Sequence, residues 1–279
     1  VGVIYPAGPV RDRARLEKGL RILRNLDLRV RHYHPDSSGP EYLAADDEQR
    51  IRNFYRLWND EEVKALIAAR GGYGCLRIIG RLDPNLLRSR PKWLIGFSDL
   101  TVLLNGISAA AGLVTLHGPM VTTLAHSDQL SFQRFKEALS GEFKPLTPTK
   151  NMEILCSGTG RGRLAGGNLT TLTHMIGTPW QPDLTGKILF LEDTGEPLYK
   201  LDRMLTHLAC CGLLNNRLVA GSSPAGPTMQ IKGLRAIVAP FCVAKRFIVG
   251  WSSSCHHTTR SATRLLKPSS SKQPDMIQN

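Results

Sequence analysis

The stretch Ile95-Gly96-Phe97-Ser98-Asp99-Leu100-Thr101 ends the apolar run Trp93–Ile95 at a glycine and places a serine just before a helix-like segment. We predict a strand that turns sharply into a helix, with Ser98 at the corner. Such a corner lifts the serine out of the sheet and points backbone N–H groups at a substrate oxygen, as a nucleophile requires. The spacing is not the G-x-S-x-G of α/β-hydrolases, and a Ser-Asp pair that caps a helix would explain the same residues.

The segments before this corner alternate between strand and helix patterns. Apolar residues at helical spacing predict the helices, and short apolar runs predict the strands. The predicted order is strand Val1–Tyr5, helix Asp12–Leu26, strand Leu28–Tyr33, helix Asp46–Asn59 and the run Glu61–Ala68 before a glycine-rich turn. This alternation predicts an α/β fold with a parallel sheet that is covered on both faces and binds ligands at the carboxyl ends of its strands.

A second domain is predicted beyond a proline- and threonine-rich segment. His117-Gly118-Pro119-Met120 closes a further strand and Phe132–Leu139 is a short helix, after which the apolar pattern weakens. The pattern resumes with the helix Leu169–Ile176, the strand Lys187–Glu192 and the helix Leu201–Leu214. We therefore expect a first domain over 1–140, a linker over 141–159 and a second domain over 160–279.

Composition is that of a soluble globular protein. The chain of 279 residues is 42% hydrophobic and 21% charged, and no apolar run approaches the roughly 20 residues that span a bilayer. No signal peptide is visible, although the chain does not begin with Met. The six cysteines show no C-x-x-C pair and no metal-ligand spacing, which favours reduced thiols in the cytoplasm and argues against a metal site.

Five motifs in order give the chain a specific resemblance. They are Arg70-Gly71-Gly72-Tyr73-Gly74, the Ser98 stretch, Gly166-Gly167-Asn168-Leu169, Leu189–Asp193 and Tyr199–Leu205. Together they resemble the LD-carboxypeptidase (murein tetrapeptidase) family of serine peptidases from Val1 to about Leu214. The resemblance implies a Rossmann-like first domain, a smaller β-rich, swivel-like second domain, and an active site between them.

The resemblance also implies an activity. It indicates a cytoplasmic Ser-His-Glu carboxypeptidase whose substrate is a murein tetrapeptide that loses its terminal D-alanine during cell-wall recycling. It implies no cofactor and no metal, and a homodimer that binds neither nucleic acid nor membrane. Two alternatives stay open: a microcin C-type self-immunity peptidase of the same family, marked by a nucleotide-stacking aromatic such as Trp180 or Trp251, and a catalytically defective binding relative.

Roles carry over to the residues that match the motifs. Ser98 is the expected nucleophile, and the backbone N–H groups of Gly72 and Asp99 are the expected oxyanion hole, where glycine allows close approach and positive φ. Glu192 at a strand end is the expected orienting acid, ahead of its neighbours Asp193 and Glu196.

Substrate contacts are expected from the glycine turn and from the start of the second domain. Gly71, Tyr73 and Asn168 are the candidates, although an ordinary tight turn explains the glycines and a helix cap explains Asn168 equally well. Cys75 beside the turn has no evident partner and is expected to be inert.

The base is the member of the triad that the motifs do not fix. The family histidine follows a strand of the second domain in a Gly-His pair, and His256 or His257 stands at the comparable distance after Glu192, but Ser254-Cys255 replaces the glycine. Of the other histidines, His117 is assigned only to the first domain, without a catalytic role.

The end of the chain is atypical in charge. Residues 217–279 hold nine Lys and Arg and one acid, Asp275, so they carry +8 of the net charge of +13. A solvated surface normally mixes both signs. A basic nucleic-acid arm and a tail translated in a shifted frame are the two interpretations, and the loss of resemblance after Leu214 favours the second.

Overall fold

The computed structural model describes residues 1–36, 39–142, 160–214 and 248–249. Its first sheet is wholly parallel and has the strand order β2-β1-β3-β4-β5, which confirms the predicted α/β class. The strands are β1 (Gly2–Ile4), β2 (Arg31–His32), β3 (Ala65–Ala68), β4 (Trp93–Gly96) and β5 (Leu116–His117). The predicted strand Leu28–Tyr33 is therefore too long, because this edge strand pairs only with Gly2 and Val3 of β1.

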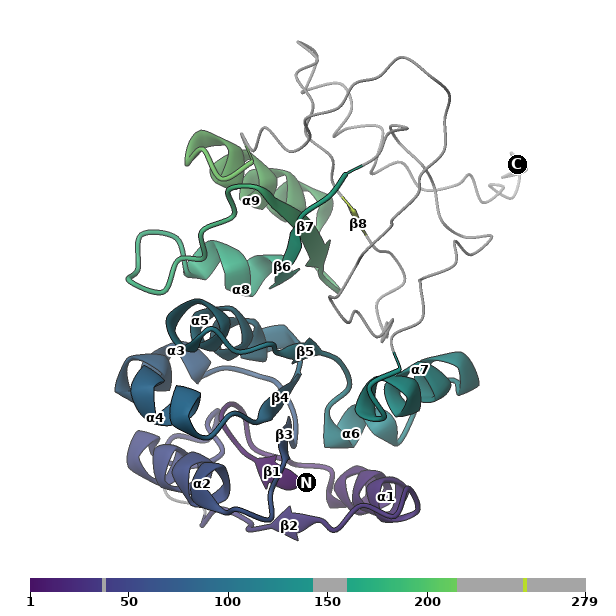
Figure 1. The fold of residues 1–279 in the computed structure, drawn as a ribbon. Helices are drawn as coiled ribbons and strands as arrows, with labels where there is room; N and C mark the ends of the chain where they lie inside the picture. Colours follow the sequence, from purple (N-terminus) through teal and green to yellow (C-terminus); the bar gives the residue numbers. More distant parts are fainter. Residues whose placement is uncertain (37–38, 143–159, 215–247, 250–279) are drawn as a thin grey trace, which may run out of the picture.

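Helices cover both faces of this sheet (Figure 1). One face carries α1 (Arg13–Arg24), α6 (Val121–Leu124) and α7 (Gln129–Leu139); the other carries α2 (Asp47–Asn59), α3 (Cys75–Ile78), α4 (Pro84–Ser89) and α5 (Thr101–Ala111). Each layer buries its own apolar cluster against the strands, one around Leu20 and Phe135 and the other around Phe54 and Trp58. Burial of these side chains holds the carboxyl ends of the strands in fixed positions.

A second, smaller sheet begins after the linker region. Its order is β6 (Arg163–Asn168), β7 (Lys187–Glu192) and β8 (Ile248–Val249), with β6 and β7 parallel and β8 antiparallel to β7. The helices are α8 (Leu169–His174) and α9 (Leu198–Cys210). The predicted helix 201–214 starts too late and runs too far, because Pro197 sets the start of α9 and Gly212 adopts a positive φ just after its end.

The two sheets meet through α5, the helix that follows Ser98 (Figure 1). The Asn105 side-chain amide donates to the carbonyl of Gly166 at 2.8 Å, and the Asn168 backbone N–H donates to Thr101 Oγ1 at 3.0 Å. Gly167 lies against the same threonine with a φ of 135°. The carboxyl end of β6 is thus fastened directly to the start of α5.

We expect Gly167→Ala to lower the stability of the protein by disturbing this junction. A Cβ at Gly167 would lie 2.6 Å from Thr101 Oγ1, in a backbone conformation that L side chains rarely adopt. Strain and overpacking together should cost about 2–5 kcal/mol of unfolding free energy in urea titration. Gly177→Ala is the matched control, since Gly177 also has positive φ but a Cβ there would meet no atom within 4 Å, and it should cost about 1 kcal/mol. Equal losses in both variants would contradict a junction role for Gly167.

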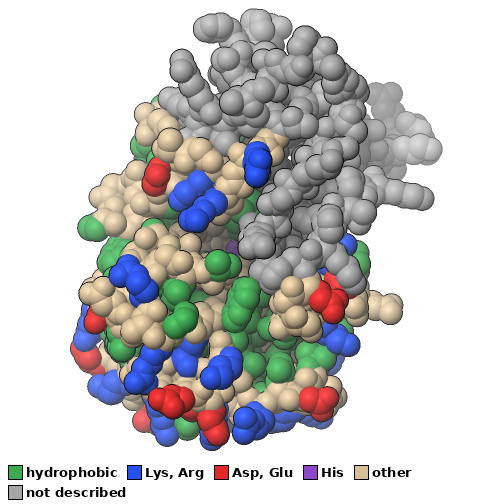
Figure 2. Space-filling view, in the orientation of Figure 1, with side chains coloured by type: hydrophobic (Ala, Val, Ile, Leu, Met, Phe, Trp, Pro, Cys, Tyr) green, Lys and Arg blue, Asp and Glu red, His purple; other side chains and the backbone are tan. Residues whose placement is uncertain are grey.

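Charges of both signs share the surface seen in Figure 2. Lys and Arg side chains are interspersed there with Asp and Glu, and they form no single-sign stripe on the face shown. No helix in the described ranges is long and apolar enough to cross a membrane. Most of the predicted linker 141–159 and nearly all of the basic segment 217–279 lie outside the described residues, so the domain boundaries and the shifted-frame interpretation stay predictions.

Candidate active site

Ser98 stands at a strained corner between β4 and α5. The strand ends at Gly96, and a short 3-10 turn over Ser98–Leu100 leads into the helix. The φ of Ser98 is +63°, a left-handed value that few residues other than glycine adopt. The cap position of this turn is Phe97 and not Ser98, so helix capping does not explain the serine. A corner of this kind, held against its own strain by the surrounding fold, is typical of functional sites.

The glycine-rich turn after β3 lies directly against this serine. A Cβ built on Gly71 would be 3.1 Å from Ser98 Oγ, so Gly71 leaves the space that the hydroxyl faces. Gly72 has a φ of 125° and its missing Cβ would lie 2.9 Å from the backbone of Gly8. Within the described ranges, neither the Gly72 nor the Asp99 backbone N–H donates to another residue. The structure thus brings the expected oxyanion donors and the serine into one region.

Two buried charged side chains brace the turn from behind. The Arg50 guanidinium donates to the carbonyl of Gly74 at 3.0 Å and also to that of Pro6. The Asp99 carboxylate accepts from the Cys75 backbone N–H at 2.8 Å. Asp99 therefore has a structural side chain in addition to its backbone N–H. Burial raises the pKa of the Cys75 thiol well above its ordinary value, as expected for an inert cysteine.

Glu192 reaches Ser98 from the second sheet. It ends β7 in register with Asn168 of β6, its side chain is buried, and the Ser98 backbone N–H acts to lower its pKa. Burial, with the nearby Asp193 charge, raises the pKa of Glu192 to about 7, while the Asn168 side chain and the Ser98 backbone N–H act to lower it. The carboxyl group is therefore poised to change its charge near neutral pH.

The two neighbouring acids are committed elsewhere. Asp193 accepts from the Thr170 backbone N–H at 2.9 Å and from the Thr170 hydroxyl at 2.7 Å, so it caps α8. Glu196 forms an ion pair with Lys200, at 3.4 Å, on the first turn of α9.

Two other residues expected to contact substrate, Asn168 and Tyr73, differ in whether their side chains already have partners. Asn168 accepts from the Thr171 backbone N–H at 2.9 Å and so caps α8, which is the structural alternative that the sequence left open. Tyr73 is half exposed in the glycine turn, and its ring centroid lies 5.9 Å from that of the exposed Tyr42. Tyr73 is therefore free to contact a ligand, whereas the Asn168 side chain already has partners.

The histidine that the structure places next to Glu192 is not one that the sequence predicted there. His256 and His257 lie outside the described residues. His117, assigned by sequence only to the first domain, lies with Nε2 3.9 Å from Glu192 Oε1. No local signal marks this pairing, because it depends on how the two sheets meet. No hydrogen bond joins Ser98 Oγ to a histidine of the described ranges.

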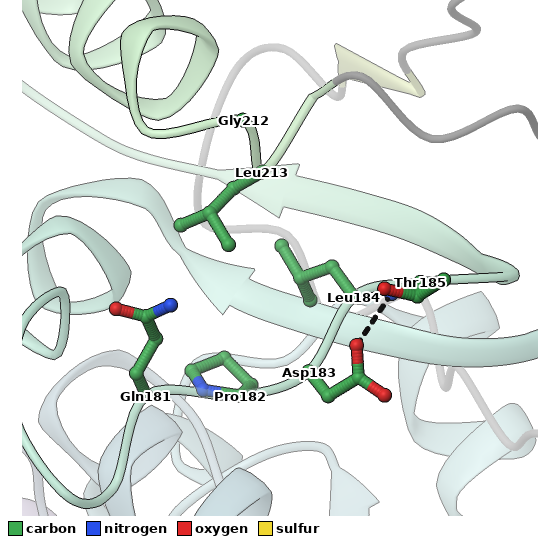
Figure 3. A pocket seen from close by; sticks show the side chains of 7 residues that line it. All are labelled: Gln181, Pro182, Asp183, Leu184, Thr185, Gly212 and Leu213. Atoms are coloured by element: carbon green, nitrogen blue, oxygen red, sulfur yellow. Dashed lines mark hydrogen bonds between the residues drawn. The ribbon is translucent and has the colours of Figure 1, made fainter.

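Other candidate sites are weaker. A pocket of about 310 Å³ lies between the loop 181–185 and the end of α9 (Figure 3). Its one acid, Asp183, accepts from the Thr185 backbone N–H at 2.9 Å and has no basic or nucleophilic partner among the lining residues. This pocket is at the amino end of β7, whereas Glu192 is at the carboxyl end. The described ranges contain no group of His, Cys, Asp and Glu able to hold a metal ion.

Comparison with known proteins matches both sheets to one family. The sequence profile described as LD-carboxypeptidase N-terminal domain matches residues 1–118, and that of the LD-carboxypeptidase C-terminal domain matches residues 161–266. The second match extends beyond Leu214, where the resemblance was expected to fail.

Individual relatives agree with this match. The probable murein peptide carboxypeptidase of Bacillus subtilis is 38% identical over 226 residues, which cover 77% of this chain and 69% of that protein. The crystal structure of muramoyltetrapeptide carboxypeptidase from Oxalobacter formigenes is 34% identical, with a TM-score of 0.66, over 76% of this chain and 72% of that one. The microcin C7 self-immunity protein, at 24% identity, shares the fold with a TM-score of 0.69, over 77% of this chain and 74% of that one.

Proposed function

Because the chain belongs to the LD-carboxypeptidase family, we propose that it is a serine carboxypeptidase that releases the terminal D-alanine of a murein tetrapeptide. The observation that carries the proposal is the strained Ser98 corner, which faces the Gly71 turn and whose backbone N–H acts to lower the pKa of the buried Glu192 of the second sheet. The names of the relatives at 34% and 38% identity support the murein substrate. The cytoplasmic location and the homodimer stay predictions from the resemblance.

The proposed reaction is an acyl transfer to serine. Ser98 Oγ attacks the carbonyl carbon of the L–D peptide bond, and a histidine takes the hydroxyl proton and gives it to the leaving D-alanine amine. His256 or His257 is the proposed base, with Glu192 holding its imidazole in orientation. The N–H groups of Gly72 and Asp99 would stabilise the oxyanion, and water would then hydrolyse the acyl-enzyme.

The packing of Trp180 favours this substrate over an aminoacyl nucleotide. A Cβ built on Gly80 would lie 3.7 Å from Trp180 Nε1, and one built on Gly106 would lie 3.5 Å from its ring. The indole therefore packs between the second domain and the first, which leaves less of the ring available to stack on a nucleotide base. Trp251, the other aromatic candidate, lies outside the described residues.

A comparison of three ligands tests the proposal. We expect D-alanine release, followed by mass spectrometry, from a murein tetrapeptide, and none from the same peptide ending in L-alanine. An aminoacyl sulfamoyl adenosine should stay intact. Cleavage of the sulfamoyl adenosine alone would favour the self-immunity activity. Calorimetric binding of the tetrapeptide with no release would instead indicate a binding relative without turnover.

A further inference from the structure

His117 is enclosed where the two sheets meet. It ends β5, in register with Gly96 of β4, and its side chain is only 10% exposed. Its ring stands edge-on to Phe190 of β7, with centroids 4.9 Å apart, and lies 6.1 Å from the ring of Phe97. These contacts fix the imidazole plane next to Glu192. A residue that only filled the core would not need ring nitrogens there.

One polar atom on each side chain has no hydrogen-bond partner among the described residues. His117 Nε2 is 3.9 Å from Glu192 Oε1, and both His117 Nδ1 and Glu192 Oε1 lack a hydrogen-bond partner in the described part of the chain. A buried polar atom without a partner costs about 1–3 kcal/mol, so the unpaired Glu192 Oε1 beside His117 Nε2 calls for an explanation. Shortening the gap by about 1 Å would give a normal hydrogen bond.

The proton of the neutral imidazole has one favourable position. Burial lowers the pKa of His117 to about 4, so the ring is neutral at pH 7 and carries a single N–H. Nδ1 has no acceptor among the described residues, whereas Nε2 faces a carboxylate oxygen. The favoured tautomer therefore carries its proton on Nε2.

We propose that His117 is a positioning residue for Glu192: its Nε2–H stabilises the charged carboxylate across the 3.9 Å gap before substrate binds, and the carboxylate accepts it as a hydrogen bond as the site tightens around substrate. The inference rests on the proposed function, since Glu192 is the orienting acid there. A carboxylate oxygen has two lone pairs, so Oε1 can take the N–H of His117 and still accept from the base. Catalytic hydrogen bonds that are long in an unliganded site commonly shorten in the substrate complex.

The described groups that act on the pKa of Glu192 come from β7, from β6 and from the Ser98 corner. Asp193 on β7 raises its pKa, while Asn168 from β6 and the Ser98 N–H from the corner lower it. The side chains of β8 are outside the described set. His117 supplies a further N–H donor from β5, and its loss should make the charged carboxylate less stable.

His117→Phe and His117→Gln test the proposal. Phe keeps a ring but removes the N–H, whereas the Gln side-chain amide can place a donor near the position of Nε2. The pKa of the acid limb in the pH profile of kcat/KM for D-alanine release should rise by about one unit in His117→Phe. A shift of this size matches the loss of one hydrogen bond to a charged group. At pH 7 kcat should fall about fivefold with KM within twofold, and His117→Gln should restore the wild-type limb. An unmoved limb in the Phe variant would overturn the proposal.

A measurement without substrate separates this inference from the proposed function. The ¹³C carboxyl shift of Glu192, assigned by its disappearance in Glu192→Gln, should titrate about one unit higher in His117→Phe than in wild type. If that shift occurs but wild type releases no D-alanine, the contact stands and the proposed function fails. If wild type is active but the Glu192 titration is unchanged, the inference fails.

Two further measurements distinguish a positioning role from a catalytic base and from misfolding of the variant. A loss of kcat by more than about 10³ at every pH, with no recovery in His117→Gln, would make His117 the base and overturn a positioning role. Circular dichroism would report whether His117→Phe folds, and His117→Leu, smaller and equally unable to donate, would replace it in the same titration if it does not.

Discussion

Ser98→Ala should lower D-alanine release by a factor of at least about 10³ while leaving stability nearly unchanged. The hydroxyl is the proposed nucleophile, and residual turnover from the oxyanion donors alone is small. Alanine keeps the Cβ, so the strain of the +63° φ is retained, and no side-chain cap bond is lost. The unfolding free energy should stay within about 0.5 kcal/mol of wild type. Release kinetics and urea denaturation measure the two quantities.

Ser98→Gly is the matched control for strain. It removes the same hydroxyl but also the Cβ that makes a left-handed φ costly, so it should be as inactive as Ser98→Ala and more stable than it by about 1 kcal/mol. Retention of more than a few per cent of wild-type turnover in either variant would remove Ser98 as nucleophile.

Glu192→Gln should lower kcat by about 10²–10⁴ with little change in substrate binding. An orienting acid fixes the tautomer of its histidine and stabilises the imidazolium, and a neutral amide does neither. Glu196→Gln is the matched control, because Glu196 forms an ion pair with Lys200 on the first turn of α9. Its kcat should stay within about threefold of wild type. The reverse ranking would move the acid to Glu196.

The same variant should be more stable than wild type at alkaline pH. The folded-state pKa of Glu192, about 7, lies above the ordinary value of 4.5, so the folded protein holds this proton more tightly than the unfolded chain. Stability is therefore lost as pH rises from about 4.5 to 7, and the full penalty persists above that range. Glu192→Gln removes a penalty of up to about 3 kcal/mol at pH 8 and should give no gain at pH 4.

Thermal unfolding at the two pH values measures this difference. If Glu192 is a functional carboxylate whose burial lowers the stability of the fold, the variant should be slower in catalysis and more stable at pH 8. Equal destabilisation at both pH values would instead assign Glu192 a structural role.

Local patterns in the sequence were sufficient to predict most elements and several candidate site residues. The apolar run that ends at Gly96 predicts β4, the helical spacing around Leu20 predicts α1, and Lys187–Glu192 is a strand in both sequence and structure. These signals are local because side-chain periodicity and strand ends are properties of a few neighbouring residues. The carboxyl ends of parallel strands then bring the Gly71 turn and Ser98 together.

Only the tertiary structure decided how the two sheets meet. The Asn105 bridge to Gly166 and the approach of His117 to Glu192 join residues that are distant in the chain and share no sequence pattern. The sequence made His117 a residue of the first domain alone, because nothing near it indicates a carboxylate partner. A histidine at a strand end is compatible with simple packing, and its chemistry is set by what a second domain places beside it.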